Sequence, residues 1–127
     1  MSLDLATCDA FRAKLAESFS DAFIGLPHDN ERITFPAIIL NLQGNSLLNS
    51  PLWTGQLSVA ITQQADDSTA QQHIDFVAEV AAALDGVTLD SDVVQLYGII
   101  SKTSENQNTD RHWITTLTYT IGYGPTA

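Results

Sequence analysis

The sequence is poor in the residues that build several common kinds of site. It has one cysteine, Cys8, among 127 residues, which excludes an intrachain disulfide framework and a cysteine-built zinc site. It has only 5 Lys and Arg residues against 15 Asp and Glu residues, for a formal net charge of −10. Because proteins grip nucleic acid with clustered Lys and Arg, we expect no sequence-specific binding of nucleic acid.

Long apolar segments are also missing. No window approaches the roughly 18 to 20 consecutive apolar residues of a membrane span. The first residues lack the basic start and apolar run of a signal peptide. Hydrophobic residues nevertheless make up 44% of the chain, which is the usual share in a folded domain. The sequence predicts one acidic, soluble domain over residues 1–127, made in a reducing compartment and with no membrane partner.

Catalytic and cofactor motifs are absent as well. The sequence has no Gly-x-Ser-x-Gly elbow and no glycine-rich phosphate loop. Cys8 lies on an apolar helical stripe, which is typical of an inert core thiol rather than a nucleophile. We therefore assign no catalytic residue and no cofactor, and we predict that the protein is not an enzyme.

Three groups of polar residues are candidates for a metal or other functional site. Residues 28–31 combine His28 with two carboxylates, but metal sites usually recruit ligands from separate elements. Residues 90–92 have carboxylates two apart, but the Gly and distal Glu of a calcium loop are missing. His73 lies among acidic residues of a predicted helix, which favours a solvated acidic face. No metal site is expected.

Helical spacing of apolar residues predicts two helices. The first covers residues 4–26, ends at Gly25 and Pro27, and carries a stripe of Cys8, Phe11, Leu15, Phe19, Ala22 and Leu26. The second begins at a capping box formed by Ser68 and Gln71 and ends at Asp85 and Gly86. Its predicted buried stripe comprises Ile74, Val77, Ala81 and Leu84, supported by Phe76 and Val80.

Alternating or β-branched segments predict four strands, at residues 33–42, 53–63, 93–102 and 112–123. In the second and fourth of these, apolar side chains share one parity and Thr, Ser and Gln share the other. Two polar links are expected, at residues 44–51, which carry Leu47 and Leu48, and at residues 103–110, which we expect to be mobile. Trp53 and Trp113 are expected to fill the core. The alternative is that they lie at the rim of the sheet and anchor an interface.

The resulting order, α-β-β-α-β-β, predicts an α+β fold with two layers. About four antiparallel strands would form one sheet, and both helices would pack on one of its faces. The other face keeps its Thr, Ser and Gln side chains, so it is either wet or covered by a partner.

Charge is distributed unevenly along the chain. No Lys or Arg occurs between Arg32 and Lys102. Because Asp75, Glu79 and Asp85 fall in this segment, the second helix should present a negative surface. Such a surface aids solubility, and it could also repel nucleic acid or meet a basic partner.

The layout resembles the phage tail terminator (tail completion, or minor tail) proteins, including those of prophages. The matching features are a leading helix, the strand Ile-Thr-Phe-Pro-Ala-Ile-Ile-Leu with its early proline, a second helix ending in Ala-Leu-Asp-Gly, and a last strand that runs almost to the end of the chain. The resemblance implies a structural protein without catalytic residues or cofactors. It would form a homo-oligomeric ring, a hexamer, that caps the tail tube and joins it to the head connector. Its location would be the cytoplasm of the bacterial host during assembly, and then the virion tail.

The resemblance also implies roles for particular residues. The two polar links would face partners, and the subunit or partner interface would include Leu47, Leu48, Trp53, Asn106 and Trp113. The acidic face of Asp75, Glu79 and Asp85 would line or flank the lumen through which DNA passes. Two alternatives stay open, because fold does not fix function. One is a small non-catalytic ligand-binding or regulatory domain. The other is a small enzyme with a cleft that gathers His73 or His112 with carboxylates.

Overall fold

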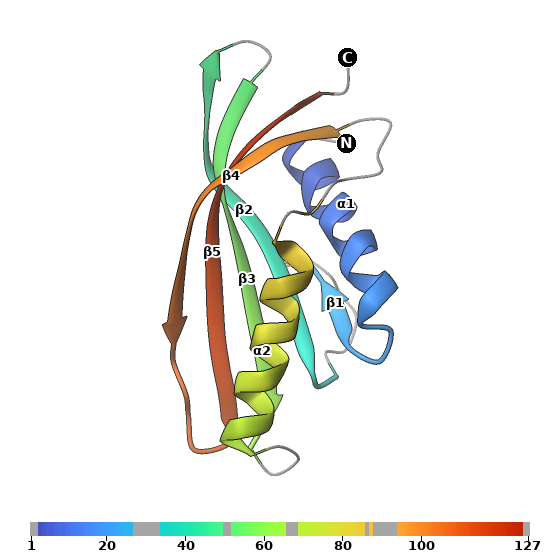
Figure 1. The fold of residues 1–127 in the computed structure, drawn as a ribbon, viewed down its shortest axis with the longest axis vertical. Helices are drawn as coiled ribbons and strands as arrows, with labels where there is room; N and C mark the ends of the chain where they lie inside the picture. The colour runs from blue at the N-terminus through green and yellow to red at the C-terminus, as the bar shows by residue number, and fades with distance from the viewer. Residues whose placement is uncertain are drawn as a thin grey trace.

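The fold combines one mixed sheet with two helices. The structure, a computed structural model, describes residues 3–26, 34–49, 52–65, 69–85, 87 and 94–125. In these residues the helices are α1 (Leu3–Ser18) and α2 (Ala70–Leu84). The strands are β1 (Phe23–Gly25), β2 (Ala37–Asn49), β3 (Leu52–Gln64), β4 (Val94–Asn106) and β5 (His112–Pro125). They form a sheet in the order β1-β2-β3-β5-β4 (Figure 1).

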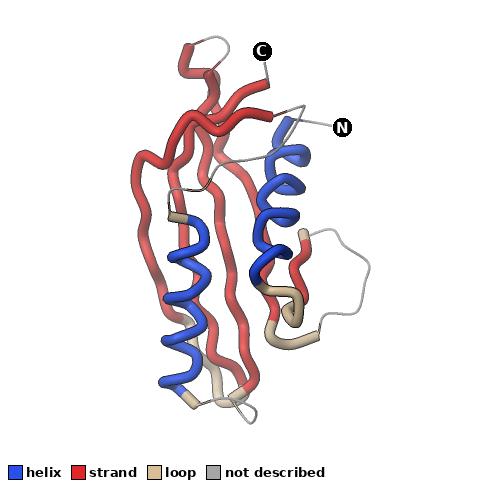
Figure 2. Tube along the Cα trace, turned by 45° about the vertical axis from the view of Figure 1, so that its right-hand side comes forward, coloured by secondary structure: helices blue, strands red, loops and turns tan. Residues whose placement is uncertain are grey.

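Both helices lie on the same side of this curved sheet, as Figure 2 shows most clearly. The α+β class is therefore confirmed. The predicted four-stranded, fully antiparallel sheet is wrong, because β1 adds a fifth strand that pairs with β2 in parallel. The other three pairings are antiparallel. The observed order of elements is α-β-β-β-α-β-β instead of α-β-β-α-β-β.

The extra strand comes from the segment that was predicted to end the first helix. Helix α1 ends at Ser18, and Phe23–Gly25 pairs with residues 37–39 of β2. Phe23 and Ile24 are aromatic and β-branched, so they suit a strand. Phe19, Ala22 and Leu26 still pack against the core. Phe19 and Ala22 lie in the turn between α1 and β1, and Leu26 follows β1. The prediction that these three side chains pack against the core is therefore confirmed, whereas the prediction that they belong to a helix is wrong.

Both predicted polar links are partly strand. β2 continues to Asn49 and β3 begins at Leu52, so residues 44–49 of the 44–51 link belong to β2. β4 continues to Asn106, which leaves residues 107–111 between it and β5. A polar composition does not end a strand whose backbone finds a partner, and Thr itself favours strands.

The capping box of the second helix is shifted by one residue from the prediction, whereas the buried stripe is correct at Val77, Ala81 and Leu84 and wrong at Ile74. The capping box is formed by Thr69 and Gln72. Thr69 Oγ1 accepts a hydrogen bond from the Gln72 N–H at 3.2 Å, and Gln72 Oε1 accepts one from the Thr69 N–H at 2.8 Å. Ser68 lies outside the described residues, as does Gly86. The most buried side chains of α2 are His73, Val80 and Leu84, whereas Ile74 is 59% exposed.

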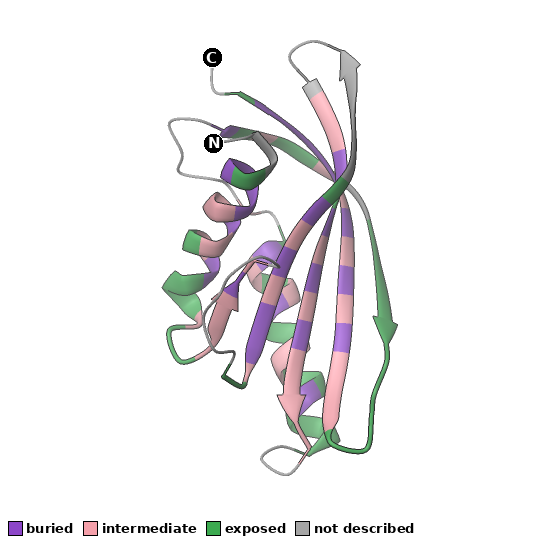
Figure 3. Ribbon diagram, turned by 180° about the vertical axis from the view of Figure 1, so that it is seen from behind, coloured by how far each residue is buried: buried purple, intermediate pink, exposed green. Residues whose placement is uncertain are grey.

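The core fills the space between the helices and one face of the sheet. Phe11 and Leu15 of α1 are 1% exposed and belong to the same cluster as Leu57, Ile61 and Ile121 of the sheet. Figure 3 shows the alternation of buried and partly exposed residues along β3 and β5. This alternation confirms the predicted parity of both strands. Cys8 is buried, as expected of a core thiol.

Candidate interaction surfaces

The outer edge of β4 is a free edge in the part of the chain that the structure describes. β4 ends the strand order, and no described strand pairs with its outer side. Residues 102–111 are all exposed. The unpaired N–H and C=O groups of an edge strand form a template on which a further strand can pair. This edge, from residue 102 to residue 106, is called the free edge below.

A groove of about 270 Å³ lies between α2 and the β4–β5 hairpin. It is called the α2 groove below, and its apolar lining comes from Ala70, Ile74 and Val77 of the helix and from Trp113. Its polar lining comes from His73, Ser104, Asn106, Asn108 and Thr115. None of these lining residues carries a carboxylate. The groove brings together Asn106 and Trp113, two residues that the sequence analysis assigned to a subunit interface.

A chain of hydrogen bonds ties three strands to α2 beside this groove. His73 Nδ1 lies 2.8 Å from Gln63 Oε1 of β3, and His73 Nε2 lies 2.9 Å from Thr115 Oγ1 of β5. Thr115 Oγ1 in turn donates to Asn106 Oδ1 of β4 at 2.6 Å. These four residues are called the His73 network. His73 is 5% exposed, so sequence reasoning that placed it on a solvated acidic face was wrong.

The bonding capacity of each group limits where the protons can lie. Thr115 donates its one hydroxyl proton to Asn106 Oδ1, so His73 Nε2 donates to Thr115 Oγ1 in this arrangement. Gln63 Oε1 faces Nδ1, so a ring protonated on both nitrogens donates to both partners. Burial lowers the pKa of His73 from its ordinary value, which favours the neutral ring. A neutral ring with its proton on Nε2 accepts at Nδ1, and the Gln63 amide then turns its –NH2 group toward the ring.

A carboxylate at position 63 is expected to raise the pKa of His73. Gln63→Glu would place a negative charge beside Nδ1, and an opposite charge stabilises the imidazolium. The measurement is a pH titration of the His73 ring resonances by NMR. Gln64→Glu is the matched control, because residue 64 lies on the opposite face of the same strand. An equal rise in both variants would show that Gln63 is not the partner of His73.

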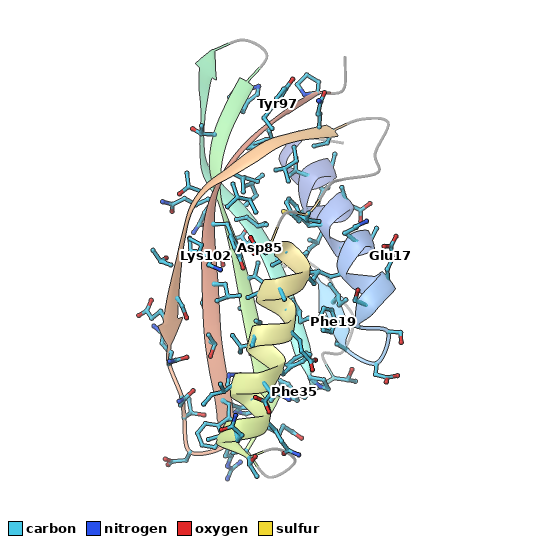
Figure 4. All side chains as sticks on the ribbon, viewed as in Figure 1. Glu17, Phe19, Phe35, Asp85, Tyr97 and Lys102 are labelled. Atoms are coloured by element: carbon cyan, nitrogen blue, oxygen red, sulfur yellow. The ribbon has the colours of Figure 1, made fainter. Side chains whose placement is uncertain are left out.

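Tyr119 and Asp85 lie at the other end of α2. Asp85 ends the helix, and its backbone N–H donates to the Ala81 carbonyl. The Tyr119 hydroxyl is buried and has no hydrogen-bond partner among the residues that the structure describes. Its pKa is raised by burial and, to a smaller extent, by the charge of Asp85. The phenol therefore stays neutral. Lys102 stands opposite Tyr119 in the β4–β5 register. Figure 4 labels Lys102 and Asp85.

The predicted acidic residues of α2 are exposed. Asp75 and Glu79 are four residues apart on the helix, and Asp85 follows at its end. Asp75 Oδ1 accepts a hydrogen bond from Gln71 Nε2 at 2.9 Å. Three carboxylates spread along one helix make a negative surface and supply no converging ligand set. Among the described residues, no group of three or more His, Cys, Asp or Glu side chains is placed to hold a metal ion.

A second and more open hollow, of about 490 Å³, lies beside the end of α1. It is lined mainly by small side chains and by Asp9 and Arg12, which form an ion pair. Since these two charges already neutralise each other, the hollow offers less for recognition than the α2 groove does.

The face of the sheet opposite the helices forms a third surface, called the open face below. No described helix covers it, and Figure 3 views the molecule from this side. Its exposure is partial, and most of its central side chains are hydroxyls or amides: Asn41, Ser58, Thr62, Thr116, Thr118 and Thr120. The sequence analysis predicted this polar face from the parity of the strands.

The remaining predicted site residues are scattered. Trp53 is partly buried and packs against the core. It lies at the opposite end of β3 from Gln63, the residue that pairs with Trp113. Leu47 pairs with Trp53 through the backbone, and the side chains of residues 47 and 48 lie outside the described part. Residues 28–31 and 90–92 also lie outside it. No helix among the described residues is long and apolar enough to cross a membrane.

Comparison with known proteins finds a shared fold. No protein-family model matches the sequence, and no curated protein matches it. Among the solved structures that match, one covers 94% of this chain and 95% of its own length, with a TM-score of 0.51 and 15% sequence identity. The name of that protein carries no functional description. A likeness at this identity shows the fold alone.

Proposed function

We propose that this protein is a structural component of a phage or prophage tail. It acts as a tail terminator, forming a homo-oligomeric ring, a hexamer, that caps the tail tube and joins it to the head connector. The observation that carries the proposal is the free edge of β4 beside the α2 groove, where Asn106 and Trp113 lie together. An exposed edge strand next to a partly apolar groove is suited to binding another polypeptide.

A ring needs two different surfaces on each subunit, because each copy contacts one neighbour on each side. The free edge and the α2 groove form one such surface. The acidic face of α2, formed by Asp75, Glu79 and Asp85, then lines or flanks the lumen. Negative charge at that position lets DNA pass without binding to the wall.

A small ligand-binding or regulatory domain is the second candidate, and the α2 groove favours it. At about 270 Å³ the groove lies near the lower limit of small-molecule sites. Its lining nevertheless combines Trp113 with several convergent polar groups. Such a domain would remain a monomer or dimer at every concentration.

The sharpest test of the proposed function is deletion of the gene from the prophage or phage that carries it. A tube without its terminator keeps growing and cannot join a head, so tails of irregular length without heads are expected by electron microscopy. A plasmid copy of the wild-type gene should restore normal particles. Normal, head-joined tails of uniform length in the deletion strain would contradict the proposal.

A further inference from the structure

The register of the sheet aligns the polar residues of the open face into transverse rows. Thr118 of β5 stands between Thr103 of β4 and Ser58 of β3, and Ser58 stands beside Asn41 of β2. The next row contains Thr120, Gln56 and Gln43. Four neighbouring strands therefore contribute hydroxyl or amide groups to one row, and the described side chains of the next row come from three of them.

These rows carry no charge, although the chain has a net charge of −10. The described carboxylates belong to α1 and the turn after it, to α2, or to the β4–β5 end of the sheet: Asp9, Glu17, Asp21, Asp75, Glu79, Asp85, Glu105 and Asp110. Among them only Glu105, on the edge strand, occupies a register position of the open face. Two copies can therefore approach each other here with little like-charge repulsion.

The open face also suits docking for a conformational reason. Threonine is β-branched and has few χ1 rotamers, so little side-chain entropy is lost when a row of threonines is covered. Hydroxyl and amide groups both donate and accept hydrogen bonds, so they can pair with a backbone or a polar surface in either direction. A neutral and stiff surface of this kind favours protein as its partner.

We propose that the open face is the second ring surface, on which the free edge and α2 groove of a neighbouring copy dock. The proposal rests on the proposed function and names the surface that it leaves unassigned. Charge favours a second copy over a basic partner, since a basic partner would be attracted to α2 and not to neutral rows. The segment offered by the neighbour, residues 102–111, carries Lys102 and Arg111 against Glu105 and Asp110, so it is itself balanced in charge.

The first experiment places a charge at the centre of the open face. Thr118→Glu and Thr118→Lys should each bury an unpaired charge in the contact, so assembly should need roughly tenfold higher protein concentration or more. Size-exclusion chromatography with light scattering over a concentration series measures this, and circular dichroism checks that each variant is folded. Ala82→Glu, at an exposed position of α2, adds the same charge elsewhere and should assemble like the wild type.

The second experiment tests whether the contact is head-to-tail. Ile74→Glu adds a charge to the rim of the α2 groove and leaves the open face intact. At a concentration at which the wild type just assembles, each of Thr118→Glu and Ile74→Glu alone should stay monomeric, whereas an equimolar mixture should form a dimer through the one contact that neither variant has damaged. A mixture that remains monomeric would contradict this pairing of surfaces.

The outcomes separate this proposal from the proposed function. If Thr118→Glu and Thr118→Lys assemble like the wild type, the open face is not an interface. That result would leave the proposal of a ring uncontradicted. If Ala82→Glu is as defective as Thr118→Glu, net charge is the cause and the proposal is wrong. A wild-type chain that is monomeric at every concentration also overturns the proposal, and the deletion experiment then decides the proposed function independently.

Discussion

Replacing Phe11 with alanine is expected to lower the free energy of unfolding by about 3–5 kcal/mol, which is typical of a large-to-small change at a fully buried aromatic. Phe11 is 1% exposed and joins α1 to the core cluster that contains Leu40, Leu57 and Ile121. The loss of its ring leaves a cavity between the helix and the sheet. Urea denaturation followed by circular dichroism measures the change through the midpoint of the transition.

Leu5→Ala is the matched control for this prediction. Leu5 lies in the same helix but is 44% exposed, so its truncation is expected to change the free energy of unfolding by only about 0.5 kcal/mol. Equal losses in the two variants would mean that α1 does not pack on the sheet through the Phe11 side.

Replacing Gly55 with valine is expected to lower the free energy of unfolding by about 1–3 kcal/mol through overpacking. A Cβ atom at this position of β3 would lie 3.1 Å from Leu42 Cδ1 and 3.3 Å from Tyr123 Cε1. Tyr123 is fully buried, so it has little room to move aside. Thermal and urea denaturation measure the loss.

Gly98→Val provides the control, because a Cβ atom there meets nothing within 4 Å. Gly98 lies in β4, and a β-branched residue suits a strand better than glycine does. This variant should be as stable as the wild type or slightly more stable. If Gly98→Val is the more damaging of the two changes, the packing described around Gly55 is incorrect.

Some of the fold could be predicted because the signal was long and regular. In β3 and β5 the parity of Leu57, Val59, Leu117 and Ile121 against the intervening polar residues repeats over many positions. An alternation of this length fits a half-buried strand and does not fit a helix. Burial of Cys8, Phe11 and Leu15 followed equally from helical spacing at the start of the chain.

Other parts depend on contacts that sequence spacing does not report. The three residues of β1 become a strand only because β2 offers its edge. On α2 the predicted stripe is correct at Val77, Ala81 and Leu84, but the structure buries His73 where the sequence analysis expected Ile74. Burial of His73 depends on Gln63 and Thr115, which lie within hydrogen-bond distance of its two ring nitrogens.

The candidate surfaces were predictable to the same limited extent. Parity alone indicated that one face of the sheet is polar. The transverse rows through Thr118 could not be found in this way, because they require the register between strands, which the hairpin lengths and bulges set. Asn106 and Trp113 were assigned to an interface separately. Their meeting in the α2 groove depends on the extension of β4, which the sequence analysis treated as a loop.

The central claim is that this protein acts through surfaces that contact copies of itself. Hydrogen–deuterium exchange, read for each peptide at low and high protein concentration, tests that claim most directly. The unpaired amides of the free edge should exchange quickly in the monomer and slowly at high concentration, together with slower exchange across the open face. Unchanged exchange in both regions at every concentration would contradict the claim.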